Sequence, residues 1–210
     1  MKNRILCIGD SNTWGYMPGS GKRYEKEVRW TGRIAQALQQ EYEVVEEGMN
    51  GRTTAFTDRI EPGTCALDYL YPCLISQFPL DCIIVMLGTN DTKIRYGVNA
   101  VEIGYGIDEV LLQIEDACRR KGQNPVKIVI APAKLYPKPE WVEFSEESCR
   151  KAIQLTEEYR QIAAIHKAYF LSAAEILDAK CIGSDGIHFT EEGHRRLAEE
   201  ILLLIKNVTK

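Results

Sequence analysis

The stretch Arg4-Ile-Leu-Cys-Ile-Gly-Asp-Ser-Asn-Thr-Trp14 contains an apolar run of four residues that ends abruptly in small and polar residues. A short apolar run of this kind predicts a buried β-strand over residues 4–8. Ser11 follows directly, in the loop at the carboxyl end of that strand. In open α/β sheets, ligands bind at this edge. The stretch therefore predicts an α/β fold with a candidate functional serine at the edge of the sheet.

Strand and helix patterns alternate along the rest of the chain. Further strands are predicted over residues 42–46, 82–87, 126–131 and 169–171, and helices over residues 31–41, 107–121, 146–166 and 190–207. Strands that alternate with helices predict a parallel sheet between two helical layers. The length suits one well-buried domain. We expect a single domain over residues 1–210, a flavodoxin-like three-layer α/β/α sandwich with a five-stranded parallel sheet.

Composition narrows the classes of partner. The 210 residues include 26 Lys and Arg against 30 Asp and Glu, a formal net charge of −4, which argues against nucleic acid. No apolar stretch approaches the ~18 residues of a membrane span, and the first predicted strand leaves no room for a secretory signal. The seven cysteines are scattered without a Cys-x-x-Cys pair. We therefore expect a cytoplasmic protein with reduced thiols and no nucleic-acid or membrane partner.

A second polar motif lies near the end of the chain, where Asp185-Gly-Ile-His188 places a carboxylate and an imidazole three residues apart. A serine hydroxyl is a poor nucleophile until a base takes its proton. A carboxylate that accepts the imidazole Nδ1–H leaves Nε2 to be that base. Ser11, Asp185 and His188 are therefore candidates for a catalytic triad. The alternative role of Asp185 is a turn or helix cap. The other two histidines, His166 and His194, are expected to be surface or capping residues.

Four motifs together resemble those of the SGNH (GDSL-type) hydrolase family. They are Gly9-Asp-Ser11, Gly48-Met-Asn-Gly51, Gly88-Thr-Asn-Asp91 and Asp185-Gly-Ile-His188. Three finer motifs are similar to the arylesterase and acyltransferase (perhydrolase) branch of that family: Arg29-Trp-Thr-Gly32, Gly51-Arg-Thr-Thr54 and Leu87-Gly-Thr-Asn-Asp-Thr-Lys93. The chain departs from the family pattern at Asn12, where the motif that gives the family its name often has leucine.

This resemblance implies a serine esterase without a cofactor, which acts on small short-acyl or aryl esters through an acyl-enzyme. Acyl transfer or peracid formation is an expected side activity. The resemblance assigns the oxyanion hole to the backbone N–H groups of Ser11 and Gly51 and to the Asn90 amide, and acyl transfer needs such donors. Simple turn roles are the alternative for Gly51 and Asn90. No spacing of His or Cys residues indicates a metal site.

Several residues near the motifs have two interpretations. Trp14 is expected either to wall the substrate pocket or to anchor its loop, and Ile187 is a second candidate for substrate contact. Asp10 and Asp91 are expected to brace loops rather than to act as catalytic acids. Two other functions stay open for the chain: a carbohydrate O-acetylesterase and a non-catalytic, flavodoxin-like binding module.

Two long irregular stretches, residues 16–29 and 134–145, remain outside the predicted elements. Loops of this length in a compact domain are expected to be binding walls or oligomer contacts. The family resemblance implies a homo-oligomer, and the mixed apolar and charged composition of residues 16–28 suits a contact between subunits. The alternative for this loop is a solvent-exposed lid on a monomer.

Overall fold

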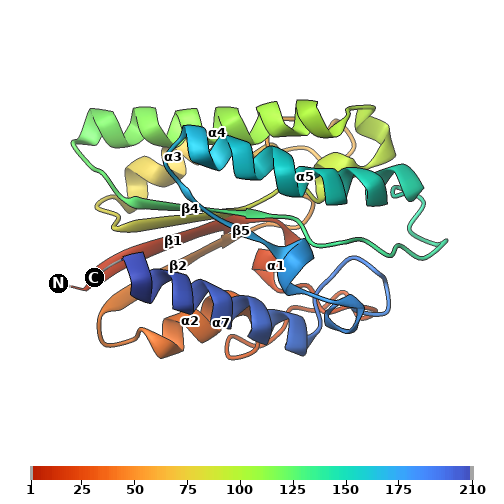
Figure 1. Cartoon of the computed structure of the whole chain (residues 1–210), viewed down its shortest axis with the longest axis horizontal. Helices are drawn as coiled ribbons and strands as arrows, with labels where there is room; N and C mark the ends of the chain where they lie inside the picture. The colour runs from red at the N-terminus through yellow and green to blue at the C-terminus, as the bar shows by residue number, and fades with distance from the viewer. Residues whose placement is uncertain (1, 209–210) are drawn as a thin grey trace.

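A five-stranded sheet runs through the middle of the protein in a computed structural model that describes residues 2–208 (Figure 1). The strands are β1 (Asn3–Gly9), β2 (Tyr42–Gly48), β3 (Cys82–Met86), β4 (Val126–Ala131) and β5 (Tyr169–Ser172). They lie in the order β2-β1-β3-β4-β5, and every neighbouring pair is parallel. This is the flavodoxin-like strand order. The predicted sheet is confirmed.

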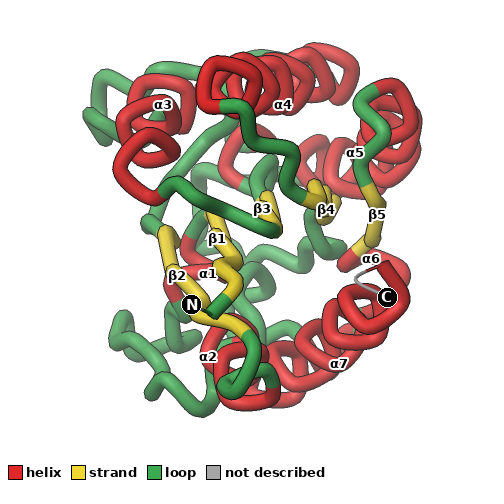
Figure 2. Tube along the Cα trace, turned by 90° about the vertical axis from the view of Figure 1, so that its left-hand side faces the viewer, coloured by secondary structure: helices red, strands yellow, loops and turns green. Residues whose placement is uncertain are grey.

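Helices cover both faces of the sheet, which Figure 2 shows nearly end-on. The helices are α1 (Ser11–Trp14), α2 (Trp30–Ala37), α3 (Ala66–Gln77), α4 (Ala100–Lys121), α5 (Glu146–Ile165), α6 (Ala173–Ile176) and α7 (Glu191–Val208). Three short 3₁₀ turns are η1 (Asn90–Thr92), η2 (Ile94–Tyr96) and η3 (Ala179–Cys181). Helices α3, α4 and α5 cover one face and α2 and α7 cover the other, so the protein has the three predicted layers (Figures 1 and 2).

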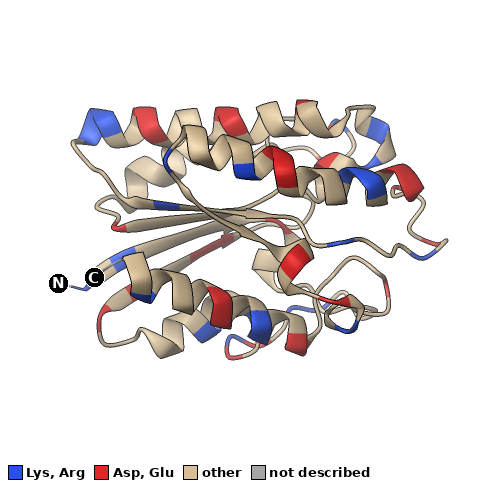
Figure 3. Cartoon of the chain, in the orientation of Figure 1, with Lys and Arg blue, Asp and Glu red and all other residues tan. Residues whose placement is uncertain are grey.

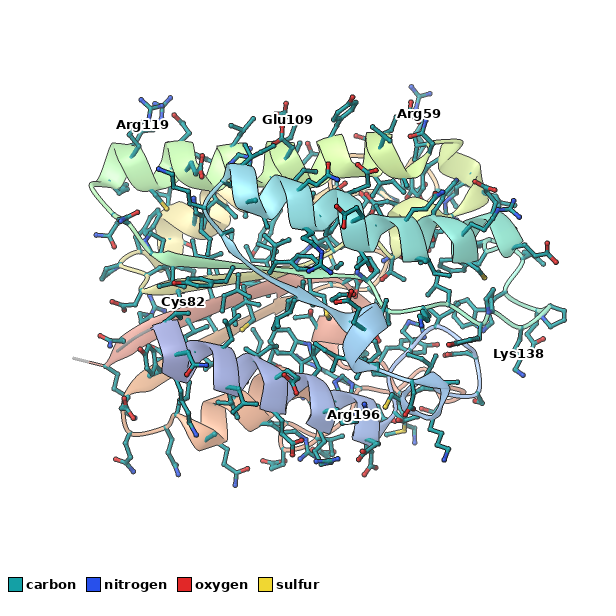
Figure 4. All side chains as sticks on the ribbon, viewed as in Figure 1. Arg59, Cys82, Glu109, Arg119, Lys138 and Arg196 are labelled. Carbon is teal, nitrogen blue, oxygen red and sulfur yellow. The ribbon has the colours of Figure 1, made fainter. Side chains whose placement is uncertain are left out.

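The two hydrophobic cores follow from the alternation of side chains along the central strands. Because successive strand residues point to opposite faces, Leu6 and Ile8 of β1 join the core on the side of α3, α4 and α5. Ile5 and Cys7 join the core on the side of α2 and α7. Every residue of β3 is buried, which agrees with the uniformly apolar sequence of that strand, and Figure 4 shows Cys82 among the side chains of the sheet layer.

Helix α3 is not among the predicted helices. Pro72 lies inside it, and a proline normally breaks a helix interior because it lacks an N–H donor. The signal that does identify α3 is the spacing of its buried residues, which are Ala66, Leu70, Cys73 and Leu74. Positions i, i+4, i+7 and i+8 share one helix face. That face packs into the core beside α4.

Two predicted helix boundaries are wrong. Helix α4 begins at Ala100 rather than at residue 107, because Asn99 and Glu102 form a capping box at its start. Helix α2 ends at Ala37 rather than at residue 41, and the next four residues form the turn into β2. The capping expected at Thr190 is present, since its Oγ1 accepts the N–H of Gly193 at 3.2 Å.

Charged residues of both signs are interspersed along the helices and the outer loops (Figure 3). None of the helices described between residues 2 and 208 combines the length and the apolar character that crossing a membrane requires.

Candidate active site

The loops that follow the parallel strands meet at the carboxyl edge of the sheet, to the right in Figure 1. Ser11 is the first residue of α1, directly after β1. Asp10 caps this short helix, with its Oδ1 accepting the N–H of Asn12 at 2.9 Å. Gly9 is required by close packing, because a Cβ at this position would lie 2.0 Å from Thr13 Oγ1. The strand end and the cap together hold the serine in place.

Ser11, His188 and Asp185 form a continuous hydrogen-bonded chain. The Nε2 atom of His188 lies 2.9 Å from Ser11 Oγ, and its Nδ1 lies 2.8 Å from Asp185 Oδ2. All three residues are buried, each with 5% of its surface exposed. The nucleophile, base and carboxylate predicted from the sequence are therefore brought together, although the serine and the histidine are 177 positions apart in the chain.

Asp185 is held in its charged form by the loop that carries the histidine. Burial disfavours its charge, but hydrogen bonds from His188 and Ile187 outweigh that effect and lower the pKa of the carboxyl below its ordinary value. Its Oδ1 accepts the backbone N–H groups of Ile187 at 2.9 Å and of His188 at 3.0 Å. The turn role considered as an alternative for Asp185 is thus present in the same side chain, through its other oxygen.

Two aromatic residues that the sequence analysis does not single out hold the imidazole. The Tyr16 ring stacks on His188 with centroids 4.1 Å apart and an interplanar angle of 28°. The Trp141 ring meets His188 edge-on at 5.7 Å. The two rings come from the loops at residues 16–29 and 134–145, which were expected to be binding walls or oligomer contacts because of their length.

The proposed oxyanion donors lie at the ends of β2 and β3. Gly51 has a φ of 77°, a left-handed conformation that favours glycine. Asn90 begins η1, and its Nδ2 donates to the carbonyl oxygen of Arg52 at 3.1 Å. Because an amide carries two N–H donors, a second one is left for a ligand.

Asp91 joins the two loops that carry these donors. Its Oδ1 accepts the backbone N–H of Thr54 at 2.9 Å and also the Thr54 hydroxyl, so it braces the loops as expected. The side chain is fully buried, and burial raises its pKa to about 6. Its second oxygen, Oδ2, has no hydrogen-bond partner among residues 2–208.

A cavity of about 310 Å³ opens over the serine. Its wall includes Ser11, Tyr16, Gly51, Asn90, Trp141, Ile187 and His188. Ile187 therefore lies where a substrate contact was expected. Trp14 is not part of the wall, so of its two expected roles the structure favours that of a loop anchor. Its ring lies 5.3 Å from the Arg23 guanidinium and 6.5 Å from the Tyr16 ring.

His166 and His194 were expected to be surface or capping residues, and neither of them lies on the surface. His194 is fully buried in α7, where its Nδ1 accepts the backbone N–H of Trp30 at 3.3 Å, and burial lowers its pKa to about 3. His166 caps the end of α5, as a capping residue would, but its ring is buried against Asp108 and Glu115. Both rings pack against residues from other elements, and such contacts depend on the tertiary structure rather than on the local sequence. Neither lines the cavity.

Within residues 2–208, no three His, Cys, Asp or Glu side chains are grouped as the ligands of a metal ion would be.

Comparisons with known proteins agree with this geometry. Residues 7–196 match the GDSL-like Lipase/Acylhydrolase family. The native aryl esterase of M. smegmatis superposes with a TM-score of 0.92 at 34% identity, covering 98% of this chain and 99% of that one. A carbohydrate acetylesterase from Sinorhizobium meliloti gives a TM-score of 0.89 at 34% identity, covering 97% and 100%. A comparison with curated protein sequences gives no significant match.

Proposed function

The chain belongs to the GDSL-like lipase/acylhydrolase family and is a carboxylic ester hydrolase, and we propose that it hydrolyses small esters through an acyl-enzyme on Ser11. The observation that carries this proposal is the 2.9 Å contact between His188 Nε2 and Ser11 Oγ, with Asp185 on the other ring nitrogen. A base hydrogen-bonded to the serine and a carboxylate hydrogen-bonded to that base together activate a serine hydroxyl.

In the first step, Ser11 Oγ attacks the ester carbonyl carbon while its proton passes to His188 Nε2. The imidazole then carries a positive charge, which the Asp185 carboxylate stabilises through Nδ1–H. The lowered pKa of Asp185 keeps this carboxylate ionised during the step. The same contact fixes the ring tautomer, so that Nε2 is the atom that faces the serine.

The negative charge that develops on the carbonyl oxygen requires hydrogen-bond donors. We assign these to the backbone N–H groups of Ser11 and Gly51 and to the second Nδ2–H of Asn90, three groups on the wall of one cavity. As the first residue of α1, Ser11 has an N–H without an intrahelical partner. Loss of one such donor typically raises the barrier by about 2.7–4 kcal/mol.

Collapse of the tetrahedral intermediate expels the alcohol, which takes its proton from His188. Water then attacks the acyl-enzyme with the same histidine as base, and the acid product leaves Ser11 free. An alcohol or peroxide in place of water would yield a new ester or a peracid. We propose this transfer as a side activity, supported by the similarity of residues 29–32, 51–54 and 87–93 to the acyltransferase branch.

The size of the cavity favours small substrates. Ligand pockets commonly range from about 300 to 1,000 Å³, so 310 Å³ lies at the lower end. Tyr16 and Trp141 narrow the space around His188 from two sides. We therefore propose short-acyl or aryl esters as substrates.

A carbohydrate O-acetylester is the second candidate substrate, and one observation favours it. The cavity wall includes the aromatic side chains of Tyr16, Trp141 and Phe144, and aromatic rings are surfaces against which a sugar ring can pack. Few such aromatic platforms are evident in the sequence, because they are dispersed between two loops. The similar carbohydrate acetylesterase of known structure adds support.

A cytoplasmic location and a homo-oligomeric state belong to the proposal as well. The seven cysteines, which lie within the described residues, are free thiols, as a reducing compartment would keep them. The oligomer is supported by the similarity of residues 29–32 to oligomeric relatives.

Labelling with a fluorophosphonate tests the proposed mechanism directly, because this probe reacts with an activated serine. We expect stoichiometric labelling of the wild type at Ser11 and none of Ser11→Ala. Ser20→Ala, which removes an exposed hydroxyl, is the matched control and should label like the wild type. An unlabelled wild type that is folded by circular dichroism would instead support the non-catalytic binding module.

A further inference from the structure

A buried lysine lies in the wall of the same cavity that contains the serine and the histidine. Lys93 has only 4% of its surface exposed, and the proposed mechanism gives it no task. Its Nζ lies 3.1 Å from Glu61 Oε2 and 3.3 Å from Glu143 Oε2, and both glutamates also line the cavity. We call these three residues the Glu–Lys–Glu clamp.

The clamp is held from behind by a second cation. Arg95 Nη2 lies 2.8 Å from Glu61 Oε2 and 2.6 Å from Asp58 Oδ2, and its Nη1 pairs with Glu143. Neither Arg95 nor Asp58 is part of the cavity wall. The carboxylates of the clamp are therefore fixed before any ligand enters, which reduces the entropy lost when a ligand binds.

The clamp borders the reacting centre on one side and solvent on the other. A Cβ at Gly51, one of the assigned oxyanion donors, would lie 2.9 Å from Glu61 Oε2. The side chains of Glu61 and Glu143 are 41% and 30% exposed, in contrast to the buried triad. The clamp thus lies beside Gly51 on the solvent-exposed side of the cavity.

The chemistry of the clamp favours one kind of ligand group. An ammonium has three N–H donors, and the two glutamates account for two of them. A hydroxyl group can accept from the ammonium and donate to a carboxylate at once. A carboxylate on the substrate would meet two negative charges, and an ammonium would meet Lys93. With two anions and one cation, the clamp carries a net charge of −1.

We propose that the Glu–Lys–Glu clamp is a specificity subsite that binds a hydroxyl group on the alcohol portion of the ester and discriminates against anionic alcohols. This inference rests on the proposed esterase function and adds its substrate class: acyl esters of neutral, hydroxylated alcohols. Lys93 supplies the donor, and Glu61 and Glu143 supply the acceptors.

Two esters of equal length test the subsite: glyceryl monoacetate, which has two hydroxyls, and propyl acetate, which has none. We expect the wild type to prefer the hydroxylated ester in kcat/KM by about tenfold or more, the effect of one hydrogen bond to a charged group. Lys93→Met removes the donor and should bring this ratio close to one, mainly through KM. Lys138→Met is the matched control, because Lys138 lies on the same loop as Glu143 but on its exposed side (Figure 4), and it should keep the wild-type ratio.

A second variant keeps the test decisive if Lys93→Met fails to fold. Glu61→Gln keeps the shape of the side chain and brings the net charge of the clamp to zero. We expect the anionic ester 3-acetoxypropanoate to be hydrolysed poorly by the wild type relative to propyl acetate. In Glu61→Gln the ratio of kcat/KM for 3-acetoxypropanoate to kcat/KM for propyl acetate should rise by about tenfold. Added salt should raise this ratio less in Glu61→Gln than in the wild type, because the variant has one negative charge fewer to screen.

The outcomes separate the subsite from the esterase. If the wild type hydrolyses none of the three acetates, the proposed function itself fails. If it hydrolyses glyceryl monoacetate and propyl acetate equally well, the subsite is contradicted while the esterase stands. Ratios that survive both Lys93→Met and Glu61→Gln overturn the subsite in the same way.

Discussion

The Oδ1 atom of Asn12 accepts the backbone N–H of Phe189 at 2.9 Å, and this bond joins the loop of the serine to the loop of the histidine. Asn12 follows Ser11 directly, and Phe189 follows His188. Asn12 is buried, with only 3% of its surface exposed. The position at which the sequence departs from the usual family motif is therefore a link between the two halves of the site.

Asn12→Leu should weaken both the fold and the activity, because it leaves the Phe189 N–H buried without a partner. The expected loss of unfolding free energy is about 1–3 kcal/mol, the usual cost of an unsatisfied buried donor. Urea denaturation measures it, with Asn124→Leu, at an exposed asparagine, as control. A midpoint and a kcat that both equal the wild-type values would contradict the bracing role.

Ser11→Ala and His188→Ala should each lower kcat for p-nitrophenyl acetate by about three orders of magnitude or more. The double variant should be no slower than the slower single variant, because the two side chains act as one unit. Circular dichroism checks that each variant is folded. Multiplicative losses in the double variant would mean that the serine and the histidine act independently, against the proposed mechanism.

Asp91 predicts a pH dependence of stability. Burial raises its pKa from 3.8 to about 6, so at intermediate pH the folded state holds a proton that the unfolded state has lost. The contribution of Asp91 to the free energy of unfolding is therefore complete below about pH 4 and is lost as the pH rises through about 6. Asp91→Asn has nearly the same shape and does not titrate.

The unfolding free energy of the wild type, measured relative to that of Asp91→Asn, should fall by roughly 2–3 kcal/mol between about pH 4 and pH 7. Urea denaturation of both proteins across this range gives the difference. A difference that is constant with pH, or one that grows in favour of the wild type, would show that Asp91 is ionised in the folded state throughout.

The small cavity predicts a preference for short acyl chains. Across p-nitrophenyl acetate, butyrate and octanoate, kcat/KM should fall by about tenfold or more beyond butyrate, because a longer chain does not fit in a cavity near the lower size limit of ligand pockets. Tyr16→Ala widens the cavity and should reduce this decline, whereas Tyr105→Ala, on the exposed surface of α4, should not. Efficient hydrolysis of the octanoate by the wild type would contradict the narrow cavity.

The proposed oligomer predicts a mass in solution that is a multiple of 23.8 kDa. Within residues 16–28, Tyr16 lines the cavity and Tyr24 is buried, so the exposed part of this loop is mainly charged. A contact made by such a surface should weaken with salt. Light scattering at micromolar concentration, in low and high salt, measures both effects. A mass near 24 kDa under all conditions would establish the monomer with an exposed lid.

Much of the fold could be predicted because its signals are local. The apolar runs locate the five strands, and alternation with helices predicts the parallel sheet. Helix α3 was not predicted, and Pro72 in its interior is a local signal against a helix that the surrounding packing overrides. The start of α4 and the end of α2 depend on a cap and a turn. These features move a helix boundary without changing the hydrophobic periodicity from which the helices were predicted.

The candidate site divides in the same way. The strand-end position identifies Ser11, the three-residue spacing before α7 pairs Asp185 with His188, and the family resemblance adds Gly51 and Asn90. The edge of a parallel sheet collects the ends of its strands, which is why Ser11, Gly51 and Asn90 meet there. The aromatic contacts of His188 and the charged clamp were not predictable, since no spacing relates Tyr16 to Trp141 or Lys93 to Glu143. The burial of His166 and His194 was not predictable for the same reason, although His166 does cap α5 as one of its two expected roles.

The sequence by itself determined the order of the five strands along the chain, the long helices other than α3, and which short motifs stand at the ends of strands. Hydrophobic periodicity and turn chemistry, which carry this information, act between neighbouring residues. Only the tertiary structure decided how the cavity is walled, which histidines are buried and how Lys93 is paired. Those features depend on loops from distant parts of the chain that meet in space. Their geometry is set by packing and charge pairing between distant segments of the folded protein, and such contacts cannot be read from a local stretch of sequence.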